Sequence, residues 1–202
     1  MKYVIEHMED GFSNWVILEY STIAKEIGAE NLILSSVKAT TKVPQELLDL
    51  GIIVTPLEVT NLKEIEPDFD ISKVCLLDPS AKSALKCSDS SKFDYFLFGG
   101  ILGDHPPRDR TGELRKLGFE GRHLDKVQMT TDTAVRVTDK VLNKNQELGD
   151  IEYIDFPQIK FSEHESVEMP FRYVKSSSNE PIMPNGMKEL IYEDFDRSFD
   201  GF

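Results

Sequence analysis

The chain has 202 residues, 40% of them hydrophobic and 29% charged, a composition typical of one globular domain. The opening MKYVIEHMED meets charge almost at once and no apolar run approaches membrane-spanning length, so no leader or transmembrane segment is predicted and a cytoplasmic location is expected. The net charge of −13 argues against a generic nucleic-acid binder and favours basic partners, although acidity can also serve solubility alone.

The first third of the chain alternates apolar runs with helical patterns. YVIEHM (residues 3–8) and NLILSS (31–36) are predicted strands. Between them, residues 13–30 are predicted to form a helix with Ser13 as its N-cap and Gly28 as its C-terminal stop. This alternation is typical of βαβ units around a parallel sheet.

The middle of the chain supplies two further buried strands. A short helix is predicted at residues 44–51, from Pro44 to Gly51, and residues 54–72 are ambiguous. KVCLLDP (73–79) and DYFLFGGILG (94–103) are the strands, and the polar stretch between them has room for a short helix. We therefore expect an α/β fold with a mostly parallel sheet flanked by helices.

The last third changes character. One or two helical turns are predicted at residues 111–118, a short strand at 121–125, and a strong helix at 130–146 with an apolar stripe and a Thr or Asp cap. Two extended segments, 151–161 and 168–174, and a helix at 184–194 follow. We assign one domain to residues 1–175, and a C-terminal helix with an acidic tail to 176–202.

Three strand ends are candidates for a ligand site, because ligands gather at the carboxyl ends of strands in open α/β sheets. They are LLDPS, GGILGDHPPRDRT and LDKVQMTTDTA. Glycines in the second allow close approach of a ligand to the backbone, and threonines in the third offer hydroxyls at a helix N-terminus. The chain has no GxxxxGK[ST], GxGxxG, GxSxG or HExxH motif, and its four histidines and two cysteines have no metal-binding spacing. Neither a phosphate cradle nor a metal site is predicted.

The order of LLDPS, FGGILGDHPPRDRT and HLDKVQMTTDTAVRV resembles the SPOUT methyltransferases, whose C-terminal half forms a trefoil knot. The opening YVIEHMEDGFSNWVILEY, together with GGILGDHPPRDRT, QMTTDTA and EMPFRYV, is similar to the protein arginine methyltransferases of that class, known from fungi and archaea. This resemblance covers residues 2–174.

The resemblance implies S-adenosylmethionine as cofactor, bound by three loops of the knot. Adenine needs an apolar slot with backbone partners, and the apolar residues of these loops suit that need. Transferred by motif position, the cofactor-binding residues are Leu77, Asp78, Pro79, Gly99, Gly100, Ile101, Gly103, Leu124, Lys126, Gln128, Met129, Thr131 and Thr133.

An arginine acceptor is normally protonated and must lose a proton during methylation, so carboxylates are expected beside it. Asp104 is the leading candidate, with His105 as a proton relay or a lock on the loop. Glu6 and Glu19 are the other catalytic candidates, although Glu19 fits a solvated helix face equally well. His7 and His123 are predicted to be structural or surface residues.

Several residues near these motifs keep two interpretations. The run 108–110, Arg-Asp-Arg, either locks its loop or touches the substrate. Phe12 and Trp15 either stack on the incoming guanidinium or, as we prefer, pack into the core. EMPFRYV, with Glu168 and Arg172, either forms a wall of the substrate groove or adds an edge strand.

The resemblance implies monomethylation of an arginine in a small-subunit ribosomal protein, a basic protein that suits an acidic enzyme. One alternative is a SPOUT-class tRNA guanine-N1 methyltransferase, because GGILGD is similar to that branch, but the acidic charge disfavours tRNA. Another is a non-catalytic adaptor for a basic protein. A monomer is favoured over a homodimer, because the groove must stay open to a folded substrate.

Overall fold

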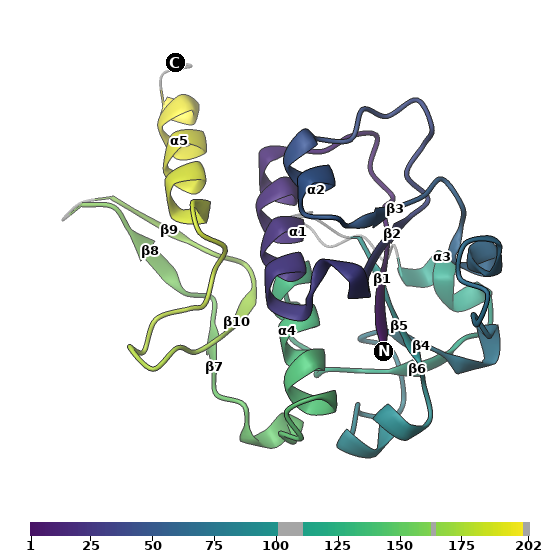
Figure 1. Cartoon of the computed structure of the whole chain (residues 1–202). Coiled ribbons are helices and arrows are strands. Elements are labelled where there is room, and N and C mark those ends of the chain that lie inside the picture. The colour runs from purple at the N-terminus through teal and green to yellow at the C-terminus, as the bar shows by residue number, and fades with distance from the viewer. Residues whose placement is uncertain (101–110, 163–164, 200–202) are drawn as a thin grey trace.

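The computed structural model describes residues 1–100, 111–162 and 165–199, with side chains described up to Asp194. Its centre is a six-stranded sheet with the strand order β3-β2-β1-β5-β4-β6, in which every neighbouring pair is parallel (Figure 1). The strands are β1 (Lys2–Glu6), β2 (Leu32–Ser35), β3 (Ile53–Val54), β4 (Val74–Leu77), β5 (Tyr95–Gly99) and β6 (Glu120–Arg122). The predicted mostly parallel α/β sheet is confirmed.

Both faces of the sheet are covered, and successive strand residues enter different cores. Tyr3 and Ile5 belong to one hydrophobic cluster and Val4 to another, as the period-two geometry of a strand requires. The first cluster takes its helical side chains from α1 (Asn14–Ile27), α2 (Gln45–Asp49) and α4 (Thr131–Leu142). The second takes them from the 3₁₀ segment η2 (Val59–Glu64) and from α3 (Thr111–Lys116).

Helix α1 begins and ends where its capping residues predict. Ser13 is the N-cap and its hydroxyl oxygen accepts a hydrogen bond from the backbone N–H of Val16 at 3.3 Å. Gly28 ends the helix with a φ of 85°, a conformation that glycine adopts without strain. These local signals fix both ends of the helix before any tertiary contact is considered.

Most of the stretches with a weak sequence pattern form short 3₁₀ segments. Residues 54–72, which were ambiguous, contain the end of β3, then η2, then the start of η3 (Ile71–Lys73). The short helix allowed between β4 and β5 is η4 (Cys87–Ser91). The remaining 3₁₀ segments are η1 (Ala29–Asn31) and η5 (Leu148–Asp150).

The C-terminal module, residues 153–199, lies beside α1 (Figure 1). It consists of two antiparallel pairs, β7 (Tyr153–Asp155) with β10 (Arg172–Val174) and β8 (Gln158–Lys160) with β9 (Ser166–Glu168), followed by α5 (Met187–Phe199). Its own hydrophobic cluster includes Trp15 and Leu18 from α1. The outer face of α1 is therefore buried as well as its inner face.

Two expectations about the architecture stay predictions. The trefoil knot depends on the path between Gly100 and Thr111, which lies outside the described residues. The boundary at residue 175 is likewise untested. Within the described parts of the chain, no helix is long and apolar enough to cross a bilayer.

Candidate functional site

A cavity of about 100 Å³ lies at the carboxyl ends of β4 and β5, beside the N-terminus of α4. Three strand-end segments form most of its wall: the end of β4 with the next two residues, the end of β5, and the loop that joins β6 to α4; the first residue of α3 and two residues of α4 complete it. Its lining residues are Leu77, Asp78, Pro79, Phe98, Gly99, Thr111, Leu124, Asp125, Val127, Gln128, Met129, Thr131 and Ala134. A mainly apolar recess with a few polar groups is the usual form of a small-molecule site.

The segment after β4 is fixed by an ion pair. Nε and Nη2 of Arg115 donate to the two carboxylate oxygens of Asp78 at 2.5 and 2.8 Å. The Arg115 hydrogen bonds hold the pKa of the Asp78 carboxyl below its usual range. The Asp78 carboxylate is thus occupied by Arg115 of α3, so this segment can contact a ligand mainly through its backbone groups.

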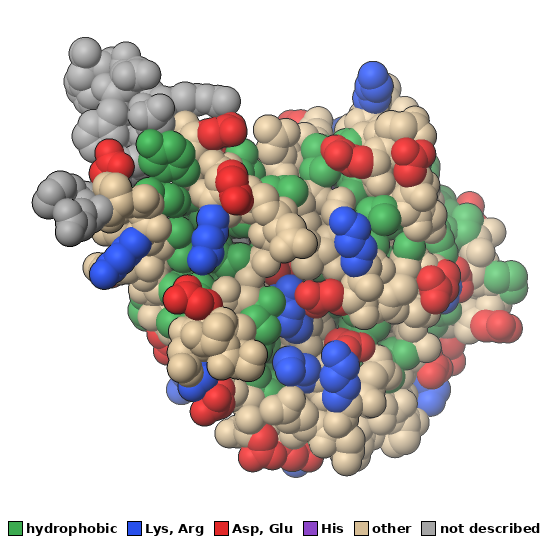
Figure 2. Space-filling model, turned by 60° about the vertical axis from the view of Figure 1, so that its left-hand side comes forward, with side chains coloured by type: hydrophobic (Ala, Val, Ile, Leu, Met, Phe, Trp, Pro, Cys, Tyr) green, Lys and Arg blue, Asp and Glu red, His purple; other side chains and the backbone are tan. Residues whose placement is uncertain are grey.

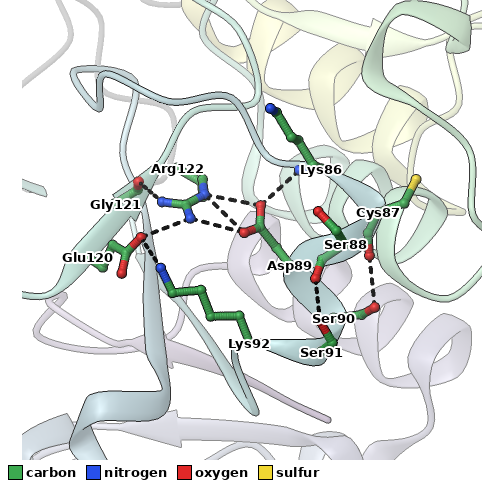
Figure 3. Close-up of polar contacts among 10 residues, drawn as sticks. All are labelled: Lys86, Cys87, Ser88, Asp89, Ser90, Ser91, Lys92, Glu120, Gly121 and Arg122. Atoms are coloured by element: carbon green, nitrogen blue, oxygen red, sulfur yellow. Dashed lines mark hydrogen bonds and ion pairs between the residues drawn. The ribbon is translucent and has the colours of Figure 1, made fainter.

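The loop after β6 is anchored at its start by Arg122 (Figure 3). The Arg122 guanidinium donates from Nε and Nη2 to Asp89, both at 3.0 Å, and its Nη2 lies 2.9 Å from Oε1 of Glu120. Asp89 also accepts from the backbone N–H of Lys86 at 2.9 Å. Because both Arg122 and Asp89 are largely buried, this network fastens β6 to η4 and sets where the loop begins.

The same loop is held from the other side by Arg172 of β10. Its backbone N–H donates to the carbonyl of Gln128 at 2.8 Å. Its guanidinium reaches Asp125 at 2.5 Å and forms a two-point pair with Asp155 at 2.6 and 2.8 Å, while lying 4.8 Å from the ring centre of Tyr153. The C-terminal module therefore supports the cavity wall, and Arg172 is committed to these partners.

The two glycines after β5 have different surroundings. Gly99 lines the cavity and has room for a methyl group, which would lie 3.4 Å from the Thr111 hydroxyl. Gly100 is packed on β1: its N–H donates to the carbonyl of Glu6 at 3.0 Å, and a Cβ there would lie 2.8 Å from that oxygen. The structure therefore places Gly99 at the cavity and gives Gly100 a packing reason for being glycine.

Glu6 lies at the carboxyl end of β1, but its carboxylate is occupied by neighbouring groups. It accepts hydrogen bonds from the hydroxyls of Ser35, at 2.6 Å, and Ser36, and from the backbone N–H of Val59 at 3.3 Å. Glu6 is not among the residues that line the cavity. This arrangement favours a structural role that ties β1 to β2 and η2.

Glu19 lies in an enclosed cluster between α1, α4 and β10, with its side chain only 1% exposed. Its Oε1 accepts from the indole N–H of Trp15 at 3.0 Å, and its Oε2 has no hydrogen-bond partner among the described residues. Burial, followed by the negative charge of Asp132, raises the pKa of Glu19 well above its usual range. The sequence alternative of a solvated helix face is wrong for Glu19, because the C-terminal module covers that face.

The N-terminus of α4 carries polar side chains that bond to one another. The Thr130 hydroxyl lies 2.7 Å from Oδ1 of Asp132 and 2.8 Å from the Thr133 hydroxyl, so it caps no backbone N–H. Thr131 lines the cavity, whereas Thr133 is fully buried and does not. The three threonines therefore differ in what they can offer a ligand.

The residues proposed for guanidinium stacking pack against protein groups. Phe12 stacks on the His7 ring with 4.6 Å between the ring centres, and Trp15 joins the hydrophobic cluster of the C-terminal module. His7 is itself buried between the hydroxyl of Tyr20 and the carbonyl of Gly11, at 3.1 and 3.0 Å. These contacts agree with the structural roles that we preferred for Phe12, Trp15 and His7.

Most of the cofactor-binding residues expected from the sequence come together in one cavity. Of the predicted set, Gly100, Lys126 and Thr133 lie outside the lining, and Ile101 and Gly103 lie outside the described residues. Asp104, His105 and residues 108–110 also lie outside them. Those that do line the cavity are Leu77, Asp78, Pro79, Gly99, Leu124, Gln128, Met129 and Thr131.

Sequence reasoning missed five of the lining residues. Asp125 and Val127 lie inside the loop that the motif marked, and Phe98 directly precedes its glycines, so proximity in sequence was a usable signal for these three. Thr111 and Ala134 become neighbours of the cavity only through the packing of α3 and α4. Among the described residues, no cluster of His, Cys, Asp and Glu could hold a metal ion.

Comparisons with known proteins place this chain in a family. The family model described as SFM1-like protein arginine N-methyltransferase matches residues 2–198. Protein arginine N-methyltransferase SFM1 of Saccharomyces cerevisiae is 50% identical over 209 residues, which cover 99% of this chain and 98% of the relative.

Solved structures agree with this placement. The yeast arginine methyltransferase SFM1 complexed with SAM matches at a TM-score of 0.91 and 50% identity, covering 96% of this chain and 90% of that chain. Another protein arginine methyltransferase matches at a TM-score of 0.59 and 38% identity, covering 96% of this chain and 94% of that one. The yeast enzyme has also been solved with SAH and with MTA. The chain belongs to the SFM1-like protein arginine N-methyltransferase family.

Proposed function

We propose that this protein transfers a methyl group from S-adenosylmethionine to one arginine of a basic protein, giving monomethylarginine. The cavity carries the proposal, because most of its wall comes from the three strand-end loops that the SPOUT resemblance implies. Its apolar side chains, among them Leu77, Phe98, Leu124 and Met129, suit an adenine ring, and nothing in its chemistry requires a phosphate. Kinship with an enzyme solved with SAM and SAH supports the same cofactor here.

The cofactor supplies an already activated methyl group, so the contributions of the chain are alignment and electrostatics. Leu77 and Leu124, which line the cavity, would contact the cofactor, and Gly99 would let the backbone approach it. Asp104 and His105 remain our candidates for the acceptor side. The packing of Glu6 favours its exclusion from that role.

The substrate that we propose is a small-subunit ribosomal protein. Ribosomal proteins are basic, and the net charge of −13 attracts them by long-range steering. On the face shown in Figure 2, acidic and basic side chains of the described residues are interspersed, so steering comes from the overall charge more than from a single patch. We also propose a cytoplasmic location. We propose that the protein acts as a monomer, because the groove must remain open to a folded substrate, and sedimentation at working concentration tests this.

Purified protein with radiolabelled S-adenosylmethionine, offered small-subunit ribosomal proteins and total tRNA in parallel, tests the function. We expect label in protein alone, recovered as monomethylarginine after hydrolysis. Label in tRNA alone would contradict the proposal and support the guanine-N1 branch. Label in neither, with the cofactor still bound, would favour a non-catalytic adaptor.

A matched pair of variants ties the activity to the cavity. Ala134 lines the cavity, so Ala134→Leu should fill part of it and weaken cofactor binding. Ala39 is exposed in a turn and does not line the cavity, so Ala39→Leu adds the same side chain away from the site. Equal cofactor affinity of the two variants, with equal melting temperatures, would show that the cofactor lies elsewhere.

A further inference from the structure

The cluster around Glu19 extends beyond that residue. Asp132, like Glu19, is 1% exposed, and its carboxylate accepts from the Thr130 hydroxyl at 2.7 Å and from Arg136 at 3.2 Å. Arg136 in turn pairs with Glu26 at 2.8 Å. Asp132 is thus supported as an anion by an arginine, whereas Glu19 has no cationic partner among the described residues and accepts from the indole N–H of Trp15.

Two buried polar atoms in this cluster have no hydrogen-bond partner in the part of the chain that the structure describes. They are Oε2 of Glu19 and the hydroxyl of Tyr173, and both residues are 1% exposed. Burial, followed by the negative charges of Asp132 and Glu19, raises the pKa of Tyr173, so the tyrosine belongs to the same electrostatic cluster as the two carboxyl groups. A buried polar atom without a partner costs about 1–3 kcal/mol, which calls for a functional or structural explanation.

Thr131 joins this cluster to the cavity. It lines the cavity, precedes Asp132 in α4, and its hydroxyl interacts with Glu19. A hydroxyl both donates and accepts, so it can receive a proton on one side while passing its own to a carboxylate on the other. The structure therefore contains a route from the proposed methyl-transfer site to an enclosed carboxyl group.

We propose that Glu19 takes up the proton that arginine methylation releases, through the hydroxyl of Thr131, and that Asp132 and Tyr173 set the protonation of Glu19. This inference rests on the proposed function. As the bond from sulfur to the methyl carbon breaks and the bond from nitrogen to that carbon forms, the guanidinium nitrogen gives its proton to Thr131, whose own proton passes to Glu19. Glu19 and Asp132 are positioning residues here, since Thr131 alone of the three lines the cavity.

The charge balance over one turnover is consistent. Two carboxylates in one buried site cannot both ionise cheaply, so the pair holds one proton, on Glu19, when no substrate is bound. The positive guanidinium of an arriving arginine favours ionised Glu19 and expels that proton to solvent. Methyl transfer returns one proton to Glu19, and departure of the cationic methylarginine restores the resting state. One proton leaves per turnover, as the reaction requires.

The groups that face Glu19 come from every element packed on it. Trp15 and Tyr20 belong to its own helix, Thr131 and Asp132 to α4, and Tyr173 to β10. Arg136 of α4 reaches the cluster through Asp132. Among the described residues, Asp132 is the one that places a negative charge directly beside Glu19. Removing that charge should lower the pKa of Glu19, so that Glu19 ionises at a lower pH.

The protonation of Glu19 can be measured without any substrate. In protein labelled with ¹³C at the glutamate carboxyl carbons, the resonance absent from Glu19→Gln belongs to Glu19. We expect it to titrate well above the other glutamates, and Asp132→Asn to move that titration to lower pH. A resonance that titrates with the exposed glutamates would overturn the proposal. This readout stands even if no arginine methylation is found, so it separates failure of this inference from failure of the proposed function.

Turnover is then measured with small-subunit ribosomal proteins as substrate. Glu19→Gln should lower kcat by about 100-fold or more with little change in the KM for S-adenosylmethionine, because proton transfer contributes roughly 10²–10⁴-fold. Glutamine has nearly the shape of the protonated acid, so the melting temperature should hold. Thr131→Val should lose kcat similarly, whereas Thr131→Ser should keep most of it.

The pH profile separates proton uptake from a packing role. The rate should rise with pH as Glu19 ionises in the substrate complex, and Asp132→Asn should move this rise to lower pH. Glu30→Gln, at an exposed site away from the cluster, is the matched control and should leave the profile unchanged. Near-wild-type kcat in Glu19→Gln, or an unshifted profile in Asp132→Asn, would overturn the proposal.

Discussion

Arg172 and Asp125 form an ion pair of 2.5 Å between the C-terminal module and the wall of the cavity. Asp125 has a φ of 138°, a strained value for a residue other than glycine. Hydrogen bonds from the Lys126 backbone N–H and from Arg172 hold the pKa of the Asp125 carboxyl below its usual range. The strained loop is thus held by a residue that lies 47 positions away in the sequence.

We expect Arg172→Ala to weaken binding of S-adenosylmethionine by about fivefold, or roughly 1 kcal/mol, because Asp125 is half exposed and its pair with Arg172 is partly screened. Titration calorimetry measures the dissociation constant. The matched control is Lys175→Ala, which removes a cation directly after β10. The ion-pair partner of Lys175 is Glu152, which is exposed and does not line the cavity. Equal affinities for the two variants would show that the module does not support the site.

Gly100→Ala should destabilise the protein by about 1–3 kcal/mol, because the added methyl would lie 2.8 Å from the carbonyl oxygen of Glu6, which is backbone and cannot move freely. Urea denaturation measures the change. Gly11→Ala is the control, since nothing lies within 4 Å of its Cβ position. If both variants unfold at the same urea concentration, the close packing of β5 on β1 at Gly100 is not rigid.

Much of this fold could be predicted because its signals are local. The apolar runs of β1, β2, β4 and β5 are largely buried strands. Ser13 and Gly28 mark the two ends of α1 by short-range chemistry. The three strand-end loops follow from the parallel sheet, since parallel strands bring their carboxyl ends to one edge. That is why most of the predicted cofactor residues line one cavity.

The roles of the carboxylates could not be predicted in the same way. Glu6 is occupied by Ser35 and Val59, which lie 29 and 53 residues away, and no local pattern announces that contact. Glu19 lies on a helix face that becomes interior only when the C-terminal module packs on Trp15 and Leu18. Asp132 has the sequence pattern of an ordinary first-turn acid, and its burial depends on the same packing.

Asp89→Asn should cost about 2 kcal/mol of unfolding free energy, because it removes the buried carboxylate partner of the Arg122 guanidinium and leaves only the half-exposed Glu120 carboxylate beside it (Figure 3). Cofactor affinity should fall as well, since β6 leads into the cavity loop. Urea denaturation and calorimetry give the two values. The control Glu113→Gln breaks the exposed pair with Lys116 and should change neither the unfolding free energy nor the cofactor affinity. If Asp89→Asn unfolds at the same urea concentration as the wild type, the pair of Asp89 with Arg122 adds nothing to the anchoring of β6.

His7 should make stability depend on pH in the weakly acidic range. Burial lowers its pKa from the ordinary value of 6.5, and the ring is held as a neutral group: Nε2–H donates to the Gly11 carbonyl, so Nδ1 accepts from Tyr20. The unfolded chain therefore takes up this proton at a higher pH than the folded chain. The contribution of His7 to stability is fully present above pH 6.5 and is lost as pH falls through the folded pKa.

The slope of unfolding free energy against pH isolates this effect. His7→Gln removes the titrating group and should flatten the curve just below pH 6.5, even though it also changes absolute stability. Tyr20→Phe removes the donor to Nδ1 but keeps the imidazole buried, so its curve should keep the wild-type slope. If His7→Gln retains that slope, another group binds the proton, and burial of His7 is not what makes the protein less stable in acid.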